Sequence, residues 1–126
     1  MRYIGVDQYK KFSYIAVMDE RGGIVKEGKV VNDREELKKF LRGCRDGKAE
    51  AVIEAGPSWT VMYDWLEGEI DGVKLANPLK VKAIADAKIK TDKIDATILA
   101  HLLRADLIPE AYVPKVETRK IKNILR

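Results

Sequence analysis

Apolar residues at the start of the chain fall in short runs that are typical of β-strands. Tyr3 to Val6 is a short apolar run that ends at Asp7, and Phe12 to Met18 is a second run rich in aromatic and β-branched residues. Two adjacent glycines within Asp19 to Gly23 indicate a turn, and Ile24 to Val31 follows as a third strand. The pattern predicts a three-stranded antiparallel meander.

Helical spacing follows, and then a short strand. Asp33 with Glu36 three residues later is a variant of the capping box, and apolar residues then recur three and four apart. This predicts a helix from about 34 to 44. Ala51 to Ile53 is a short buried strand that ends at Glu54, before a sharp break at a Gly-Pro pair.

The middle of the chain predicts a further helix and strand. Ser58 is the candidate N-cap of an amphipathic helix. The residues that share its apolar face are Met62, Trp65, Leu66 and Ile70. Val73 to Ala76 is then a fifth short strand.

A lysine-rich stretch follows the last predicted strand and leads into another helical pattern. Thr91 is its candidate N-cap, and the spacing predicts that Asp92 and Asp95 share one face of the first turn. Prolines end this helix, and helical spacing starts again shortly before the last residue. We therefore expect one domain over residues 1–108, followed over 109–126 by a linker and the start of a truncated helical, coiled-coil-like region.

The order of these elements indicates a fold. Three antiparallel strands followed by helix, strand, helix, strand and helix is the order of the RNase H-like fold of RuvC type. We therefore predict an α/β domain whose five-stranded mixed sheet has the order 3-2-1-4-5, with helices on both faces. Strands 1 and 4 are then parallel neighbours, which places Asp7 beside Glu54 at the edge where open α/β sheets bind ligands.

Length and composition fit one compact domain. The chain has 126 residues, of which 46% are hydrophobic, and a domain of this size buries roughly two-thirds of its unfolded surface. Its apolar runs are much shorter than the ~20 residues that span a bilayer, and the N-terminus lacks signal-peptide features, so we expect a soluble cytoplasmic protein that does not bind membranes. Cys44 and His101 are single residues of their types, which excludes a Cys/His zinc cage and leaves oxygen ligands for any metal ion.

Positive charge is concentrated in the second part of the chain. Residues 1–77 carry 13 Lys and Arg against 14 Asp and Glu, whereas residues 78–126 carry 11 against 6, a net charge of +5. The lysines around the KTDKID segment are Lys80, Lys82, Lys88, Lys90 and Lys93. Solvated surface lysines would be the ordinary explanation, but lysines beside a group of carboxylates favour phosphate contacts to a nucleic acid.

Each of the four acids at these strand and helix ends has an explanation without catalysis. Asp7 could be a turn residue, Glu54 could pair with a lysine, and two acids in a first helical turn suit the helix dipole. The predicted fold, however, brings all of them to one place, where carboxylates repel one another. One or two Mg²⁺ or Mn²⁺ ions would neutralise them and support phosphodiester cleavage. We therefore predict a catalytic metal site formed by Asp7, Glu54, Asp92 and Asp95.

The sequence resembles the DEDD transposases of insertion sequences, which are related to the Piv and MooV DNA invertases. The resemblance covers nearly the whole chain and is carried by YIGVDQYKK, VIEAG, ANPLKVKAIADAKIKTDKIDATILAHLLR and DLIPEAYVP. The four acids of the family fall on Asp7, Glu54, Asp92 and Asp95. Two departures concern loops, because Tyr9 stands where the family often has a small residue, and Gly56-Pro57 where it often has Thr-Gly.

This resemblance implies the N-terminal RuvC-like domain of a transposase or site-specific DNA recombinase that uses Mg²⁺ or Mn²⁺. The partners that it implies are DNA, a structured guide RNA in part of the family, and further copies of the chain in a homo-oligomer. It also implies a C-terminal domain with a serine nucleophile. Ser13 and Ser58 match no motif of that kind, so we expect this stretch alone to be inactive in recombination.

Three other interpretations stay open. The same acids would suffice for a free-standing Holliday-junction nuclease of RuvC type, and the chain could instead be a nucleic-acid-binding or oligomerisation module without chemistry. The opening strand, aspartate and hairpin also resemble the first phosphate loop of actin-like ATPases and sugar kinases. That loop needs Gly and Ser or Thr around the phosphate, and Gln8 to Lys11 offer neither.

Overall fold

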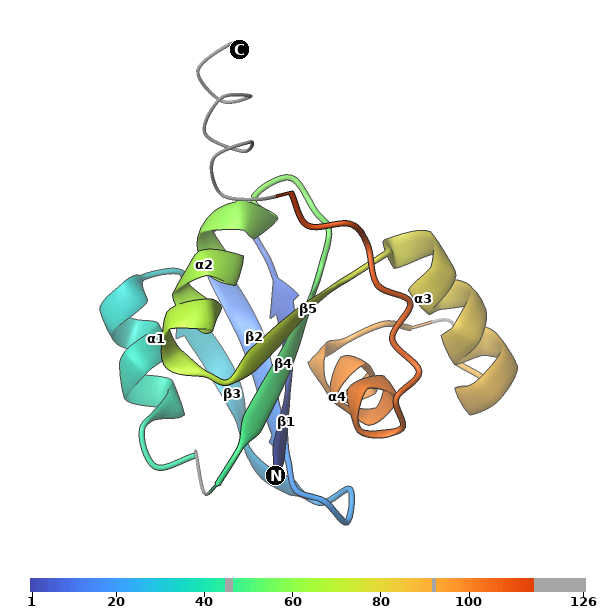
Figure 1. Ribbon diagram of the computed structural model, residues 1–126, viewed down its shortest axis with the longest axis horizontal. Coiled ribbons are helices and arrows are strands. Elements are labelled where there is room, and N and C mark those ends of the chain that lie inside the picture. Colours follow the sequence, from blue (N-terminus) through green and yellow to red (C-terminus); the bar gives the residue numbers. More distant parts are fainter. Residues whose placement is uncertain (45–46, 92, 115–126) are drawn as a thin grey trace, which may run out of the picture.

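A five-stranded mixed sheet forms the centre of the structure, which is a computed structural model and describes residues 1–44, 47–91 and 93–114. The strand order is β3-β2-β1-β4-β5, so the predicted order and the RNase H-like fold are confirmed. β1 pairs antiparallel with β2 and parallel with β4. Figure 1 shows helices on both faces of this sheet.

The strands lie close to their predicted positions. They are β1 (Arg2–Gln8), β2 (Phe12–Met18), β3 (Ile24–Val31), β4 (Ala49–Glu54) and β5 (Gly72–Ala76). The first strand continues further than its apolar run, because the hairpin to β2 pairs Asp7 with Tyr14 and Gln8 with Ser13. Asp7 therefore lies within a strand, one residue before its end.

The helices include two elements that the sequence pattern does not predict. The helical segments are α1 (Arg34–Leu41), α2 (Trp59–Glu69), α3 (Pro78–Ile84), the π-helix η1 (Ala85–Ile89) and α4 (Ala96–Arg104). The lysine-rich composition obscures the start signal of α3, in which the Asn77 side chain accepts a hydrogen bond from the Lys80 amide and Pro78 occupies the first turn. η1 continues directly from α3.

The last helix begins later than predicted. Asp95 is its N-cap, and the Asp95 Oδ1 accepts a hydrogen bond from the Ile98 amide at 2.9 Å. The prediction that Thr91 caps this helix is wrong, because the Thr91 hydroxyl accepts a bond from the Lys93 amide at 3.2 Å and closes a local turn that competes with helix formation. The prediction that Asp95 lies in the first turn is wrong as well, because α4 begins at Ala96 and Asp95 precedes it in an extended conformation. Asp92 lies outside the described residues, so its position near Asp95 stays a prediction.

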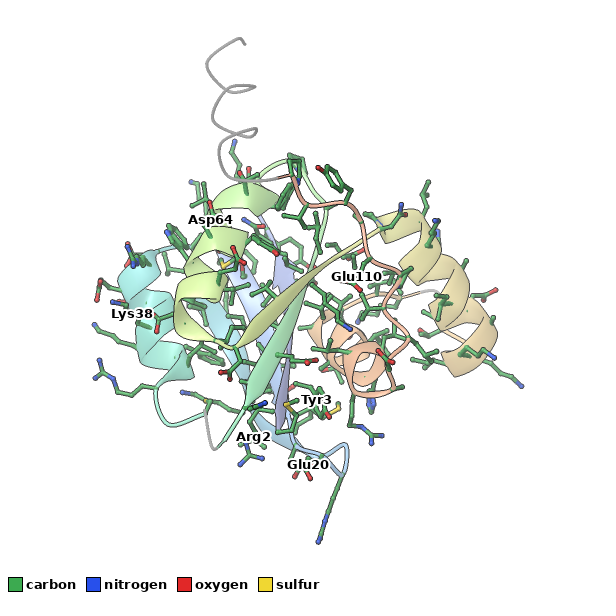
Figure 2. The ribbon with its side chains drawn as sticks, in the orientation of Figure 1. Arg2, Tyr3, Glu20, Lys38, Asp64 and Glu110 are labelled. Carbon is green, nitrogen blue, oxygen red and sulfur yellow. The ribbon has the colours of Figure 1, made fainter. Side chains whose placement is uncertain are left out.

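Each face of the sheet has its own hydrophobic core. α1 and α2 pack on one face, and the buried residues there include Leu37, Leu41, Met62, Leu66, Ile4 and Ile53. α3 and α4 pack on the other face, where the core consists of Val52, Ala76, Val81, Leu99, Leu102 and Leu103. Figure 2 shows side chains filling both layers, with Arg2, Tyr3 and Glu20 near the amino end of β1.

The chain remains in contact with the sheet after α4. The Ala111 amide donates to the Leu75 carbonyl at 2.7 Å, and Glu110 forms an isolated antiparallel bridge with Ala76. The segment from residue 109 that was expected to be a linker thus begins as part of the folded body, and the helix expected near the end of the chain falls outside the described residues. Within the described ranges, no helix is long and apolar enough to cross a membrane.

Gly5 allows α4 to lie directly on β1. A Cβ at this position would overlap the Ala96 carbonyl oxygen and lie 2.8 Å from the Ala100 amide nitrogen, and both of these atoms belong to the helix backbone. Backbone atoms cannot move aside as the end of a flexible side chain can, so the position requires a residue without a side chain. Gly5 therefore sets the separation between β1 and the helix that starts after Asp95.

We expect Gly5→Ala to lower the free energy of unfolding by about 1–3 kcal/mol or more, because the added methyl group forces α4 away from the sheet. Urea unfolding followed by circular dichroism measures this loss. Gly68→Ala is the matched control, since Gly68 lies on an exposed part of α2 with open space around it, and this change should stabilise by up to about 1 kcal/mol. Equal stability of the Gly5→Ala variant and the wild type would contradict the close packing.

Candidate functional site

Asp7 and Glu54 lie next to each other on one face of the sheet. The last residue pair between the parallel strands β1 and β4 is Val6 with Ile53, and each acid directly follows its strand's member of that pair. Val6 and Ile53 belong to the core under α1 and α2. Because side chains alternate along a strand, both acids are on the opposite face, which α3 and α4 cover.

Asp95 approaches this pair from the start of α4. Asp95 and Asp7 line the same hollow of the surface, and the negative charge of Asp95 contributes to a raised pKa of Asp7. One carboxylate oxygen, Oδ1, is used to cap the helix through the Ile98 amide. The structure therefore places Asp7 near both Glu54 and Asp95, and Asp92 is outside the described residues.

Burial and repulsion raise the pKa of both strand acids. For Asp7 the largest cause is desolvation by burial; a hydrogen bond from Tyr9 acts in the opposite direction, and Asp95 adds to the rise. For Glu54 desolvation by burial is again the largest cause of the raised pKa, and the negative charge of Asp7 raises it further. A nearby cation would relieve both effects, because it favours the ionised form of each carboxyl group.

Two hollows in the surface meet at Asp7 and Tyr9. The first, which we call the Glu54 hollow, has a volume of about 500 Å³ and is lined by Asp7, Tyr9, Lys10, Glu54, Ser58 and Pro78, among others. The second, the Asp95 hollow, has a volume of about 460 Å³ and includes Asp7, Tyr9, Phe12, Glu27, Lys93 and Asp95 in its lining. Asp7 is thus the acid that the two hollows share.

Two residues of this region were not expected from the sequence to contribute to it. The Tyr9 hydroxyl donates a hydrogen bond to the Asp7 Oδ2 at 2.9 Å, and this bond, followed by the charge of Asp7, raises the pKa of the Tyr9 phenol. Glu27, on the outer strand β3, lines the Asp95 hollow. Alternation of side chains along β3 could have indicated Glu27. It places Glu27 on the same face as Asp7, but only once the register of both hairpins is known.

The donor groups fit a divalent ion by their chemistry. In the described ranges, no three Asp, Glu, His or Cys side chains are arranged to hold a metal ion. The acids that converge are carboxylates, which suit Mg²⁺ and Mn²⁺. The pKa values of Asp7 and Glu54 are raised first by burial and then by the charge of a neighbouring acid, and a bound cation would counter both effects. The four-acid metal site stays a prediction, because it includes Asp92.

The five predicted phosphate-binding lysines are all exposed. They lie on α3, on η1 and in the segment that leads to α4, and they are Lys80, Lys82, Lys88, Lys90 and Lys93. In the parts of the chain that the structure describes, none of them forms an ion pair with an acidic side chain. Lys93 lines the Asp95 hollow, so at least one of these charges lies beside the acids.

We expect Asp7→Asn to lower the pKa of Glu54 and to stabilise the metal-free protein at neutral pH. The pKa values of Asp7 and Glu54 in the folded protein lie above their usual 3.8 and 4.5. The stability contributed by such groups is complete below the unfolded pKa and is lost as the pH rises through the folded pKa. Carboxyl NMR titration and urea unfolding at pH 4 and pH 7 measure the two effects.

Asp86→Asn is the matched control for this prediction, because Asp86 is exposed on η1. The free energy of unfolding of the Asp86→Asn variant should differ from that of the wild type by less than about 0.5 kcal/mol. A Glu54 pKa that is the same in the wild type and in Asp7→Asn would contradict the electrostatic coupling between these two acids.

Comparisons with known proteins show which family the chain resembles. A sequence model of the IS110-type DEDD family, described as "Transposase", matches residues 4–126. The transposase for insertion sequence element IS1533 of Leptospira borgpetersenii is 29% identical over 128 residues, which cover 98% of this chain and 37% of that protein. The chain thus spans little more than a third of the length of this relative.

Among solved structures, component A of the (R)-2-hydroxyglutaryl-CoA dehydratase of Acidaminococcus fermentans is similar with a TM-score of 0.42 and 16% identity, over 71% of this chain and 35% of that one. A likeness at this level does not bear on function. The family match, in contrast, spans residues 4–126, which is nearly the whole sequence. The chain therefore belongs to the IS110-type DEDD transposase family.

Proposed function

We propose that this chain is the acid-bearing, metal-dependent domain of a transposase that cleaves and exchanges DNA strands. The observation that carries the proposal is the convergence of Asp7, Glu54 and Asp95 from two neighbouring strands and the start of α4. The residues that would hold Mg²⁺ or Mn²⁺ are Asp7, Glu54, Asp92 and Asp95. When bound, such ions activate an attacking oxygen and stabilise a leaving oxygen in phosphodiester chemistry.

The residues of the chain have separate parts in this proposal. Asp7 is shared by both hollows, so it can serve a cation on either side, together with Glu54 in one hollow and Asp95 in the other. Lys93, which lines the Asp95 hollow, would offer a positive charge to a phosphate group bound there. The exposed lysines of α3 and η1 would supply further contacts to the phosphates of a nucleic acid.

The nucleophile of strand exchange is proposed to come from elsewhere in the transposase. Ser13 is completely buried, and its hydroxyl donates to the Asn32 Oδ1 at 2.6 Å, so it cannot reach a substrate. Ser58 lines the Glu54 hollow, but it matches no nucleophile motif. A serine in a further domain, a guide RNA and a second copy of the chain would complete the active assembly.

We expect Mn²⁺ to bind this protein, and Asp7→Asn and Asp95→Asn each to weaken that binding at least about tenfold, which isothermal titration calorimetry measures. Asparagine is as good an N-cap as aspartate, so Asp95→Asn removes a charge while it keeps the start of α4. The loss of affinity should therefore occur without a large loss of stability.

Asp33→Asn provides the matched control, because Asp33 caps α1 on the opposite face of the sheet. Its Mn²⁺ affinity should equal that of the wild type. No Mn²⁺ binding by the wild type, or the same affinity in all three variants, would overturn the proposed metal site. Cleavage of a four-way DNA junction by this chain alone would instead favour a free-standing junction nuclease.

We expect Lys80→Gln, Lys82→Gln and Lys93→Gln each to weaken binding to a short DNA duplex and to structured RNA. Gel-shift measurements over a range of salt concentrations test this, because each lost phosphate contact reduces the slope of log K against log salt by about 0.9 for duplex DNA. Lys39→Gln is the control, since Lys39 lies on α1 and pairs with Glu36 at 3.5 Å. Equal slopes for Lys39→Gln and Lys93→Gln would contradict the phosphate-binding role.

A further inference from the structure

Tyr9 is held at three points, two on its backbone and one on its ring, although half of the residue is exposed. Its amide donates to the Phe12 carbonyl at 2.8 Å, which closes the tight hairpin between β1 and β2. Its carbonyl oxygen accepts a hydrogen bond from the Asn32 Nδ2 at 2.7 Å. Its ring stacks on Phe12 with centroids 4.9 Å apart, and the Lys29 Nζ lies 4.0 Å from the centroid of the Phe12 ring. A side chain with 50% exposure would otherwise sample several rotamers.

This fixed ring delivers its hydroxyl group to one oxygen of Asp7. The hydrogen bond from the Tyr9 hydroxyl to the Asp7 Oδ2 is 2.9 Å long. An ionised carboxylate offers about four lone-pair sites, so the phenol occupies one of them and leaves the others for further ligands. The bond also opposes rotation of the carboxylate about its terminal torsion, which is broad for aspartate.

We propose that Tyr9 is a positioning residue that holds the Asp7 carboxylate in the orientation that binds a divalent cation. This inference rests on the proposed metal-dependent function. Two observations point to it: Tyr9 lines both hollows together with Asp7, and its hydroxyl contacts the acid that the hollows share. Hydrogen bonds to metal-binding carboxylates orient the ligand, and their removal typically weakens metal binding 10- to 100-fold.

The test compares Mn²⁺ binding to the wild type, Tyr9→Phe, Tyr14→Phe and Asp7→Asn by isothermal titration calorimetry. Tyr9→Phe keeps the ring and its stacking on Phe12 and removes only the hydroxyl group. Tyr14→Phe is the matched control, because Tyr14 lies directly opposite Asp7 in the β1–β2 ladder and is 38% exposed. Among the described residues, its hydroxyl forms no hydrogen bond with Asp7.

We expect Mn²⁺ affinity about 10- to 100-fold lower in Tyr9→Phe and close to the wild type in Tyr14→Phe. Urea unfolding should show the same stability for both variants within about 0.5 kcal/mol, which separates positioning from a general structural role. If Asp7→Asn loses Mn²⁺ binding, two results would overturn the inference about Tyr9 alone. One is an affinity of Tyr9→Phe equal to or tighter than that of the wild type, and the other is an equal loss of affinity in the two tyrosine variants. Absence of Mn²⁺ binding by the wild type, or unchanged binding by Asp7→Asn, would overturn the proposed metal site and this inference together.

Discussion

The close packing of α4 on β1 is the constraint on which the site depends. Because Gly5 has no side chain, the helix backbone at Ala96 and Ala100 lies directly on the strand. The N-cap residue Asp95 is then carried toward the end of β1, where Asp7 lies two residues beyond Gly5. Any bulkier residue at position 5 would separate the start of the helix from the end of the strand. Acids that are nearly ninety residues apart in the sequence would then no longer meet.

This convergence of acids has an electrostatic cost, and local interactions reduce it unequally. Asp95 caps α4, where a negative charge interacts favourably with the helix dipole. Asp7 accepts the Tyr9 hydrogen bond, which lowers its pKa against the effects of burial and Asp95. For Glu54 both causes of the pKa shift raise it, namely desolvation and the charge of Asp7. Glu54 is therefore the acid whose ionised form has the most to gain from a cation.

Sequence patterns predict the strands and their order well, because short β-branched runs, turn glycines and the alternation of helix and strand leave few topologies. The start of the last helix is harder to predict, since Thr91 and Asp95 are both good N-caps. The choice between them depends on the left-handed conformation of Lys90 and on the local turn at Thr91. The contact of Tyr9 with Asp7 cannot be predicted from spacing at all, because it depends on the exact path of a hairpin. The role of Gly5 cannot be predicted from the sequence either, since only the position of α4 shows why a glycine is needed within this strand.

The fold and the hairpin contribute differently to the acid site. The sheet order alone places the end of β1 beside the end of β4, and therefore Asp7 beside Glu54. The orientation of the Asp7 carboxylate, in contrast, depends on the loop that follows it. In this chain two hydrogen bonds hold that loop: the buried Ser13 hydroxyl donates to Asn32, and Asn32 in turn donates to the Tyr9 carbonyl oxygen. The buried serine is thus explained as a support for the hairpin. Without the Tyr9 hydroxyl group, the Asp7 carboxylate would need another group to orient it, so a change at position 9 can alter the site while the acids stay the same.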